Sequence, residues 1–300
     1  MTSAPDQPRI TLVCCGLLGC LVSDEGLIER SYAEAIATQG VVSGTSAFAR
    51  RMAQVHQGRG QAPGDVLRLL FPDNEARALA ARLSFDRALG DALHRFEVKP
   101  APGVIEALAR LRGAGRTVCV LSGFPEQILD AVLGETGLRR HIDLALTVAD
   151  APRGFPAPDL VLMAMLRTGA DAVSAVAVTD ATSAGVAAGH RAGAGFVAGL
   201  LTGPHASARL KLAGADVVLR SFAALPEALP VTPAEAPVAG SEAAAPGPAG
   251  SIPGQHRRPQ RHQAPDHQGR TGSGAPPSPP VSVPVQTPRP RGAPAEPGSL

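Results

Sequence analysis

The residues with the clearest chemical potential surround the segment ITLVCCGLLGCLVSDEG, residues 10–26. Residues 10–15 form the continuous apolar pattern of a buried strand. Many enzymes place a nucleophile or a phosphate-binding turn where such a strand ends. Here the strand is followed by Gly16 and Leu17, neither of which has a reactive side chain. The segment therefore predicts a strand and turn suited to a reactive group, with no such group at that point.

Cysteine thiols are the nucleophiles nearest to this turn. Cys14 and Cys15 lie within the apolar run, so we expect both to be small buried residues. Cys20 lies in the turn and is expected to be more exposed, but a reactive thiolate needs a basic neighbour, and none stands close in the sequence. The four cysteines show neither a CxxC pair nor metal-ligand spacing, which predicts no disulfide framework and no metal centre.

Two pairs of polar residues could also bind or react. Asp24 and Glu25 could form an acid–base pair, but they fit better as the polar start of a helix near residue 26. Asp180 and Thr182 could hold a weakly bound cation, although a loop or capping role is favoured for Asp180. Both pairs therefore remain candidates with a structural alternative.

The elements that position these residues alternate between strand and helix patterns over residues 102–220. Such alternation is typical of a parallel sheet with helices on both faces. The predicted strands are 10–15, 116–124, 143–148, 174–179, 195–199 and 216–219. The predicted helices are 26–40, 102–115, 125–133, 158–167, 183–192 and 205–213. Ser122 and Gly123 fall at a strand-to-helix turn, where hydroxyl and amide groups could bind an anion.

A block of helical patterns interrupts this alternation after the first strand. Residues 27–97 contain helical spacing and no convincing strand, so we expect an all-helical cap domain inserted into the connection. The α/β core would then comprise residues 8–26 and 98–228. Ligands of open parallel sheets bind at the carboxyl ends of the strands, and a block inserted there would cover that crevice.

The last part of the chain, residues 229–300, has a different composition. Sixteen of the 29 prolines follow residue 230, and no aromatic residue follows Phe222. This Pro/Gly/Ala/Arg-rich tail lacks the bulky apolar residues needed to offset the entropy of ordering, so we expect it to be disordered. Its basic run at residues 256–263 could contact an acidic surface, although a solvated run is favoured.

Charge and hydropathy restrict the partners. A net charge of +2 and few aromatic residues argue against nucleic acid as the main partner. The chain shows neither a secretory signal pattern nor an apolar run near the roughly 20 residues of a membrane helix. We therefore expect a cytoplasmic protein that does not bind membranes.

Four segments in order resemble the motifs of the haloacid dehalogenase (HAD) superfamily, most closely its phosphonatase-like branch. They are LVCCGLLGCLVSDEG, GVIEALARLRGAGRTVCVLSGF, RGFPAPDLVLMAM and AVAVTDATSAGVAAGHRAGA, and together with the helical insert they cover roughly residues 10–225. The resemblance implies a Rossmann-like parallel sheet with a helical cap and hydrolysis of a phosphate or phosphonate. It also implies an aspartate nucleophile and Mg²⁺.

At the positions of that family's nucleophile and cap lysine, this chain has residues of other types. By the resemblance, the aspartate nucleophile corresponds to Gly16, and the site two residues later, an aspartate in many phosphatases, corresponds to Leu18. The cap lysine of phosphonatases corresponds to Pro63. The hydroxyl of the second motif is retained as Ser122, followed by Gly123.

The charged positions of the third and fourth motifs are also replaced. The basic residue that balances charge corresponds to Phe155, and Arg153 two residues earlier would have to reach round. The metal-binding acids correspond to Ala181 and Gly185, while Asp180 stands one place early, where a shifted register would turn its carboxylate elsewhere. Mg²⁺ needs several hard oxygen ligands, so we expect no metal or other cofactor here.

The resulting hypothesis is a HAD-fold pseudoenzyme, impaired in catalysis, that binds a small phosphorylated or phosphonate ligand or a protein partner. One alternative is an active hydrolase rewired through Cys20, Arg153 or Asp180. Another is an interaction protein that acts through its tail. A decaying gene product without a selected role is the fourth hypothesis.

Overall fold

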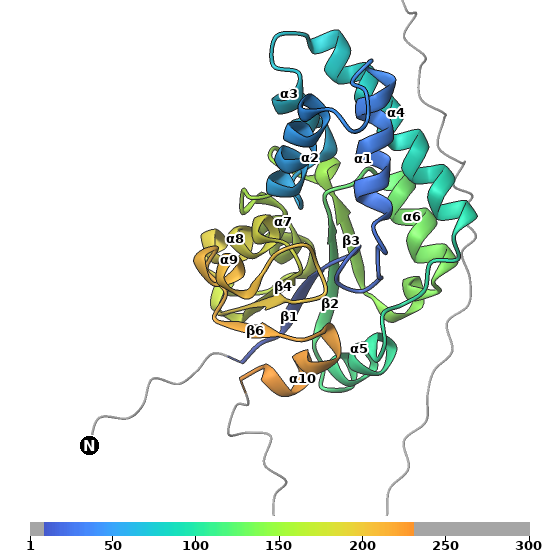
Figure 1. Cartoon of the computed structure of the whole chain (residues 1–300). Coiled ribbons are helices and arrows are strands. Elements are labelled where there is room, and N and C mark those ends of the chain that lie inside the picture. The colour runs from blue at the N-terminus through green and yellow to red at the C-terminus, as the bar shows by residue number, and fades with distance from the viewer. Residues whose placement is uncertain (1–8, 231–300) are drawn as a thin grey trace, which may run out of the picture. The chain divides into compact units, whose positions relative to one another are not determined.

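The sheet consists of six parallel strands in the order β3-β2-β1-β4-β5-β6. The computed structural model describes residues 9–230, and Figure 1 shows the arrangement. The strands are β1 (Leu12–Gly16), β2 (Thr117–Ser122), β3 (Leu144–Thr147), β4 (Val176–Asp180), β5 (Phe196–Leu200) and β6 (Val217–Leu219). All six strands predicted from the sequence are confirmed. The predicted tail lies almost wholly outside the described residues.

Helices cover both faces of the sheet because side chains of β1 alternate between two apolar layers. Val13 and Cys15 join the layer that contains α5 and α6, while Leu12 and Cys14 join the layer that contains α7 and α8. The helices of the sheet are α5 (Val104–Gly113), α6 (Glu126–Glu135), α7 (Asp159–Thr168), α8 (Ser183–Ala192), α9 (Ser207–Leu212) and α10 (Leu225–Ala228). The α/β fold and its helix positions agree with the prediction.

Four helices between β1 and α5 form what we call the helical block, residues 27–95. They are α1 (Leu27–Thr38), α2 (Ser46–Gly58), α3 (Pro63–Leu70) and α4 (Glu75–Arg95), and Figure 1 shows them gathered at one end of the sheet. Thr45 and Asn74 cap α2 and α4 by accepting from Phe48 N (3.2 Å) and Arg77 N (2.9 Å). The inserted helices are where the sequence predicted them, and their behaviour as a separate cap domain stays a prediction.

The helical block and the sheet layer share one apolar core. Tyr32 and Phe85 pack with ring centroids 4.4 Å apart, and Phe85 stacks on Phe124, which follows β2, at 6.4 Å. The two chain segments that enter and leave the block lie together, because Ala101 N donates to Leu21 O at 2.8 Å. The block is therefore held close to the carboxyl ends of the strands.

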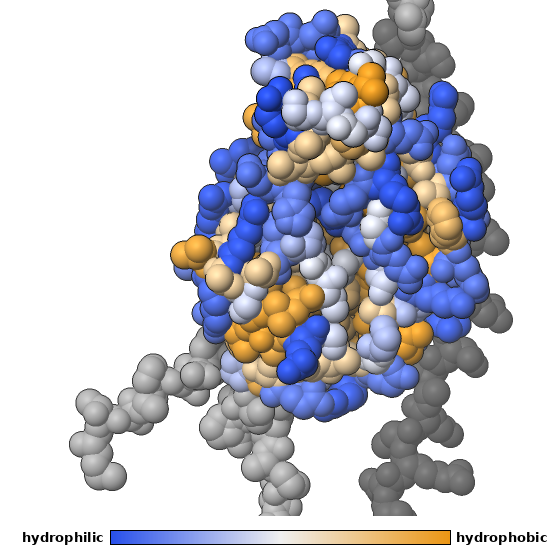
Figure 2. Space-filling view, in the orientation of Figure 1, coloured by the Kyte–Doolittle hydropathy of each residue, from blue (hydrophilic) through white to orange (hydrophobic). Residues whose placement is uncertain are grey.

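The β6 edge of the sheet keeps apolar surface. In Figure 2 hydrophobic residues gather at lower left, over the end of the sheet where β6 lies. The side chains of β6 are only partly buried, and Leu201, directly after β5, is 47% exposed. Among residues 9–230, no helix has the length and apolar character needed to cross a lipid bilayer.

Candidate functional site

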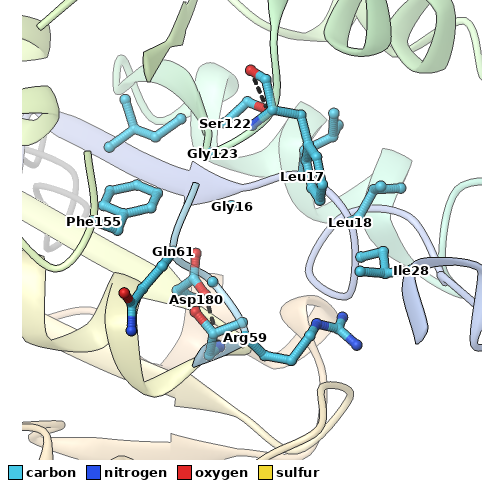
Figure 3. Close-up of a pocket in the computed structure, with 14 residues that line it drawn as sticks. Gly16, Leu17, Leu18, Ile28, Arg59, Gln61, Ser122, Gly123, Phe155 and Asp180 are labelled. Atoms are coloured by element: carbon cyan, nitrogen blue, oxygen red, sulfur yellow. Dashed lines mark hydrogen bonds between the residues drawn. The ribbon is translucent and has the colours of Figure 1, made fainter. Parts of the chain in front are cut away.

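A small pocket lies where β1, β2 and β4 end, and the loop between α2 and α3 crosses it. Its volume of about 40 Å³ has room for a few water-sized groups. Figure 3 shows the lining residues. The apolar part of the lining is Leu17, Leu18, Ile28, Leu121, Phe124 and Phe155, and the rest is Gly16, Arg59, Gly60, Gln61, Ser122, Gly123, Asp180 and Thr182. The pocket is thus at the crevice that parallel-sheet topology predicts.

Asp180 is the acidic residue among those that line this pocket. It ends β4 beside Gly16, is 8% exposed, and its Oδ1 accepts hydrogen bonds from Thr182 N and Thr182 Oγ1, both at 2.7 Å. Thr182 in turn caps α8 by accepting from Gly185 N at 3.2 Å. Burial raises the pKa of Asp180 to about 6, although the hydrogen bonds from Thr182 oppose that rise. Asp180 lines the pocket, and its bonds with Thr182 also fit the loop role that the sequence favoured, so a chemical role for its carboxylate stays a prediction.

Two glycines make room for that carboxylate. A Cβ placed on Gly16 would overlap Asp180 Oδ2 and lie 3.1 Å from Cγ. A Cβ on Gly185 would overlap the same carboxylate and lie 2.7 Å from Asp180 Cβ. Because these glycines stand at positions where the resemblance expects aspartates, Asp180 fills the volume that those aspartates would need.

Arg59 is a site residue that the sequence analysis missed. It lies between α2 and α3, is 4% exposed, and binds Asp24 at 2.6 Å and Glu29 in a second ion pair. Figure 3 shows its guanidinium pointing away from Asp180. A lone arginine between Gly58 and Gly60 was the available signal, but nothing in the sequence placed it beside Asp24. Its charge is balanced by those two acids.

Ser122 and Gly123, the candidates for anion binding, line the pocket, but the helical block lies across their turn. Ser122 is 2% exposed, and its Oγ accepts from Phe124 N at 3.1 Å. A Cβ on Gly123 would lie 3.3 Å from Gly60 O and 3.8 Å from Gln61 O. Carbonyl oxygens therefore face the turn, an arrangement that opposes an anion. Anion binding at Ser122–Gly123 stays a prediction.

Two of the residues proposed for rewired chemistry lie elsewhere. Cys20 is 1% exposed, contrary to the expectation, and its Sγ lies 3.9 Å from Thr179 O. Burial, with smaller effects from Cys15 and Asp180, raises its pKa, which disfavours a thiolate. Arg153 does not line the pocket: its side chain is 69% exposed and donates two hydrogen bonds to Asp159, at 3.0 and 2.7 Å.

The family positions and the magnesium they would hold can be compared with this geometry. Leu18 and Phe155 line the pocket, Ala181 is buried and does not line it, and Pro63 begins α3 in the block. Within residues 9–230, no group of three or more His, Cys, Asp or Glu is placed to hold a metal ion. One carboxylate with both hydrogen bonds on Oδ1 does not match the set of hard oxygen ligands that Mg²⁺ requires.

A second cluster fastens the helical block to the sheet beside the pocket. His205, 3% exposed, accepts from Ser183 N through Nδ1 (2.8 Å), and its Nε2 lies 3.1 Å from His56 O at the end of α2. Arg209 donates to Gln57 O (2.7 Å) and Ser183 Oγ (3.2 Å). Burial lowers the pKa of His205 to about 4, which keeps its ring neutral.

Comparison with known sequences identifies a family for this chain. The sequence model for haloacid dehalogenase-like hydrolases matches residues 11–193, more than half of the chain. "Probable phosphatase IndB" of Dickeya dadantii is 32% identical over 160 residues, 51% of this chain and 66% of that protein. A phosphonoacetaldehyde hydrolase of Bordetella pertussis is 36% identical over 115 residues, 38% of this chain and 41% of that enzyme. The matches span less than two thirds of these relatives.

Solved structures show the same fold. A phosphonoacetaldehyde hydrolase-like protein of Oleispira antarctica superposes with a TM-score of 0.65 at 17% identity, covering 76% of this chain and 95% of that one. A hydrolase of Pseudomonas syringae gives a TM-score of 0.64 at 22% identity, with 74% and 98% covered. At these identities the likeness concerns the fold.

Proposed function

The chain belongs to the haloacid dehalogenase-like hydrolase family, and from that premise we propose that it is a phosphonatase-like member impaired in phosphoryl transfer that works as a small-ligand-binding protein. The observation that carries the proposal is the position of Asp180. Its carboxylate fills the space over Gly16 and Gly185, where the family's mechanism requires a nucleophile and a metal ligand. The pocket then lacks the carboxylate pair around which Mg²⁺ supplies its electrostatic stabilisation.

The replacement of the family's basic residue by Phe155 supports the same proposal. Phe155 is 6% exposed and places an apolar ring in the pocket wall. The arginine that lines the pocket, Arg59, is already paired with Asp24 and Glu29. A phosphate in the pocket would therefore lie near the Asp180 carboxylate with no unpaired basic side chain from the lining to offset its charge. Both phosphate binding and phosphoryl transfer would then be unfavourable.

A working hydrolase with rewired chemistry is the second candidate, and Asp180 is the residue that favours it. Asp180 lines the pocket, whereas Cys20 and Arg153 do not. Burial raises the pKa of Asp180 to about 6, a value suited to general acid–base catalysis. Action through the tail is a further alternative, and residues 231–300 lie outside the described part of the chain.

An assay of the full chain with p-nitrophenyl phosphate and phosphonoacetaldehyde, each with and without Mg²⁺, separates these candidates. We expect product release at the rate of buffer alone, unchanged in Asp180→Asn and in the surface control Asp171→Asn. A Mg²⁺-dependent turnover that Asp180→Asn lowers tenfold or more would overturn the proposal in favour of the rewired hydrolase.

Ligand class can be examined with the same protein. A thermal shift produced by inorganic phosphate and lost in Ser122→Ala would support a phosphorylated or phosphonate ligand. The carbonyl oxygens that face Gly123 and the carboxylate of Asp180 lead us to expect no such shift.

A further inference from the structure

The pocket presents hydrogen-bond acceptors from both the sheet and the helical block. Asp180 Oδ2 lies against Gly16 at the end of β1. The carbonyl oxygens of Gly60 and Gln61 face Gly123, at 3.3 and 3.8 Å from the position of a Cβ there. Buried acceptors need donors, so a group that enters this pocket gains most if it donates several hydrogen bonds.

The charge of Asp180 is not balanced by direct contact with a basic side chain of the described residues. Both of its hydrogen bonds come from Thr182 and end on Oδ1. The guanidinium of Arg59 forms its ion pairs with Asp24 and Glu29 and points away from Asp180 in Figure 3. A cation of suitable size would therefore find a buried carboxylate to pair with.

The apolar lining and the volume limit what that cation can be. Leu17, Leu18 and Phe155 supply apolar surface against which an alkyl group can pack. An alkali ion would leave this surface unused, whereas a short alkyl group would contact it. The volume of about 40 Å³ fits a group of a few heavy atoms.

We propose that this pocket binds a small primary ammonium ion, with its N–H groups donating to Asp180 Oδ2 and to main-chain oxygens of the block and its alkyl group facing Phe155. The inference rests on the proposed function, because it assigns a ligand class to the same pocket.

Proton binding to Asp180 should compete with the ammonium ion. Since burial raises the pKa of this carboxyl to about 6, the ionised form that attracts a cation predominates above that value. A bound cation lowers the pKa again, so the affinity should rise between pH 5 and pH 8.

Thermal unfolding of the full chain at pH 8 tests the proposal, with methylammonium chloride as the ligand. At a concentration near ten times Kd, we expect the Tm to exceed that in sodium chloride of equal ionic strength by about 3 °C. Tetramethylammonium, which has no N–H donor and is bulkier, should behave like sodium. The shift should disappear in Asp180→Asn and persist in Asp171→Asn, an exposed control.

Equal shifts with methylammonium and tetramethylammonium, or a shift retained in Asp180→Asn, would overturn the proposal. If Asp180→Asn fails to fold, the ¹³Cγ resonance of Asp180 in the unaltered protein provides the second readout. Methylammonium should then lower the pKa of Asp180, and an unchanged pKa would overturn the proposal.

Phosphatase turnover measured on the same samples keeps the two ideas separate. Absence of the methylammonium effect together with absence of turnover overturns the ligand assignment and leaves the impaired hydrolase in place. Mg²⁺-dependent turnover overturns the proposed function itself, whatever the amine does.

Discussion

At the scale of single residues, Asp180 and Gly16 depend on each other. The carboxylate of Asp180 can lie where it does because Gly16 has no Cβ, and the Cβ of an aspartate at residue 16 would overlap that carboxylate. This aspartate would also bring a second negative charge close to it. Restoring the family's aspartate at residue 16 alone should therefore lower the stability of the fold rather than restore catalysis.

We predict that Gly16→Asp lowers the free energy of unfolding by about 2–3 kcal/mol, through overpacking and like-charge repulsion. Adding Asp180→Ala removes the colliding carboxylate, so Gly16→Asp/Asp180→Ala should be more stable, by at least about 1 kcal/mol, than the sum of the two single losses predicts. Urea unfolding of the double-mutant cycle measures this coupling.

Gly90→Asp is the matched control, since a Cβ at Gly90 meets nothing within 4 Å. This variant should change the free energy of unfolding by no more than about 0.5 kcal/mol. Strict additivity of Gly16→Asp and Asp180→Ala would contradict the steric explanation.

The raised pKa of Asp180 has a consequence for stability with a definite sign. The folded-state value of about 6 lies above the ordinary 3.8, so the fold prefers the protonated carboxyl. Its contribution to stability should be lost as pH rises from about 4 to 6, at a cost on the order of 3 kcal/mol. Asp180→Asn should therefore be more stable than the unaltered protein at pH 8, with the difference closing at pH 4.

Urea unfolding at several pH values checks this prediction, with Asp171→Asn as the variant that should follow the unaltered curve. The stability of Asp180→Asn is compared with that of the unaltered protein at each pH. If the variant loses stability relative to the unaltered protein between pH 4 and pH 8, the ionised carboxylate is stabilising.

At the scale of elements, Arg59 connects the helical block to the segment that enters it. Its ion pairs join the α2–α3 loop to Asp24, before the block, and to Glu29 in α1. We predict that Arg59→Met lowers the free energy of unfolding by about 2–4 kcal/mol, because it leaves partly buried carboxylates unpaired. It should also speed hydrogen exchange in α2 and α3.

Arg68→Met provides the control, because the Arg68–Asp65 pair is exposed. Surface pairs of this kind contribute up to about 1 kcal/mol, so its loss should change stability and exchange very little. Equal effects of the two variants would mean that Arg59 has no special part in holding the block.

The elements themselves could be predicted from sequence, since apolar runs and helical spacing are local signals. All six strands were placed to within about two residues, and the helical insert was located between β1 and α5. Strand order is not local, and parallel pairing of β1 with both β2 and β4 emerged from the structure.

The site was less predictable, because it depends on where side chains point and what packs over them. Asp180 was assigned by counting along a motif, and a shift of one place decides whether a carboxylate enters the pocket. Cys20 was expected at the surface because its turn was judged by sequence alone, yet Thr202 of a distant loop donates to Gly19 O at 2.6 Å and helps to cover that turn. Arg59 joins the site through contacts with Asp24 and Glu29 that no motif describes.

At the scale of the whole molecule, His205 couples the attachment of the helical block to pH. Its ring is neutral in the fold because burial lowers its pKa from 6.5 to about 4. A depressed histidine pKa means that stability is full above pH 6.5 and is lost as pH falls towards 4. His56, Arg209 and Arg59 lie near enough to oppose a second positive charge there.

We predict that His205→Gln, which keeps a polar side chain without a titrating ring, reduces the loss of stability between pH 6.5 and pH 4 by on the order of 1 kcal/mol or more. Guanidinium unfolding across that interval gives the measurement. His94→Gln, at a side chain that is 73% exposed, is the comparison. A His205→Gln curve parallel to that of the unaltered protein would locate the acid sensitivity elsewhere.

The hydrogen bond between Ala101 and Leu21 has an architectural consequence. The chain leaves the sheet and returns to it at neighbouring points. Residues 27–95 could therefore be exchanged as one unit without changing the order or direction of the strands. A transplant from a related protein would need compatibility where Phe85 meets Phe124 and where His205 and Arg209 contact the end of α2. Variants of this chain with an exchanged helical block would have a new cover over the pocket and an unchanged sheet.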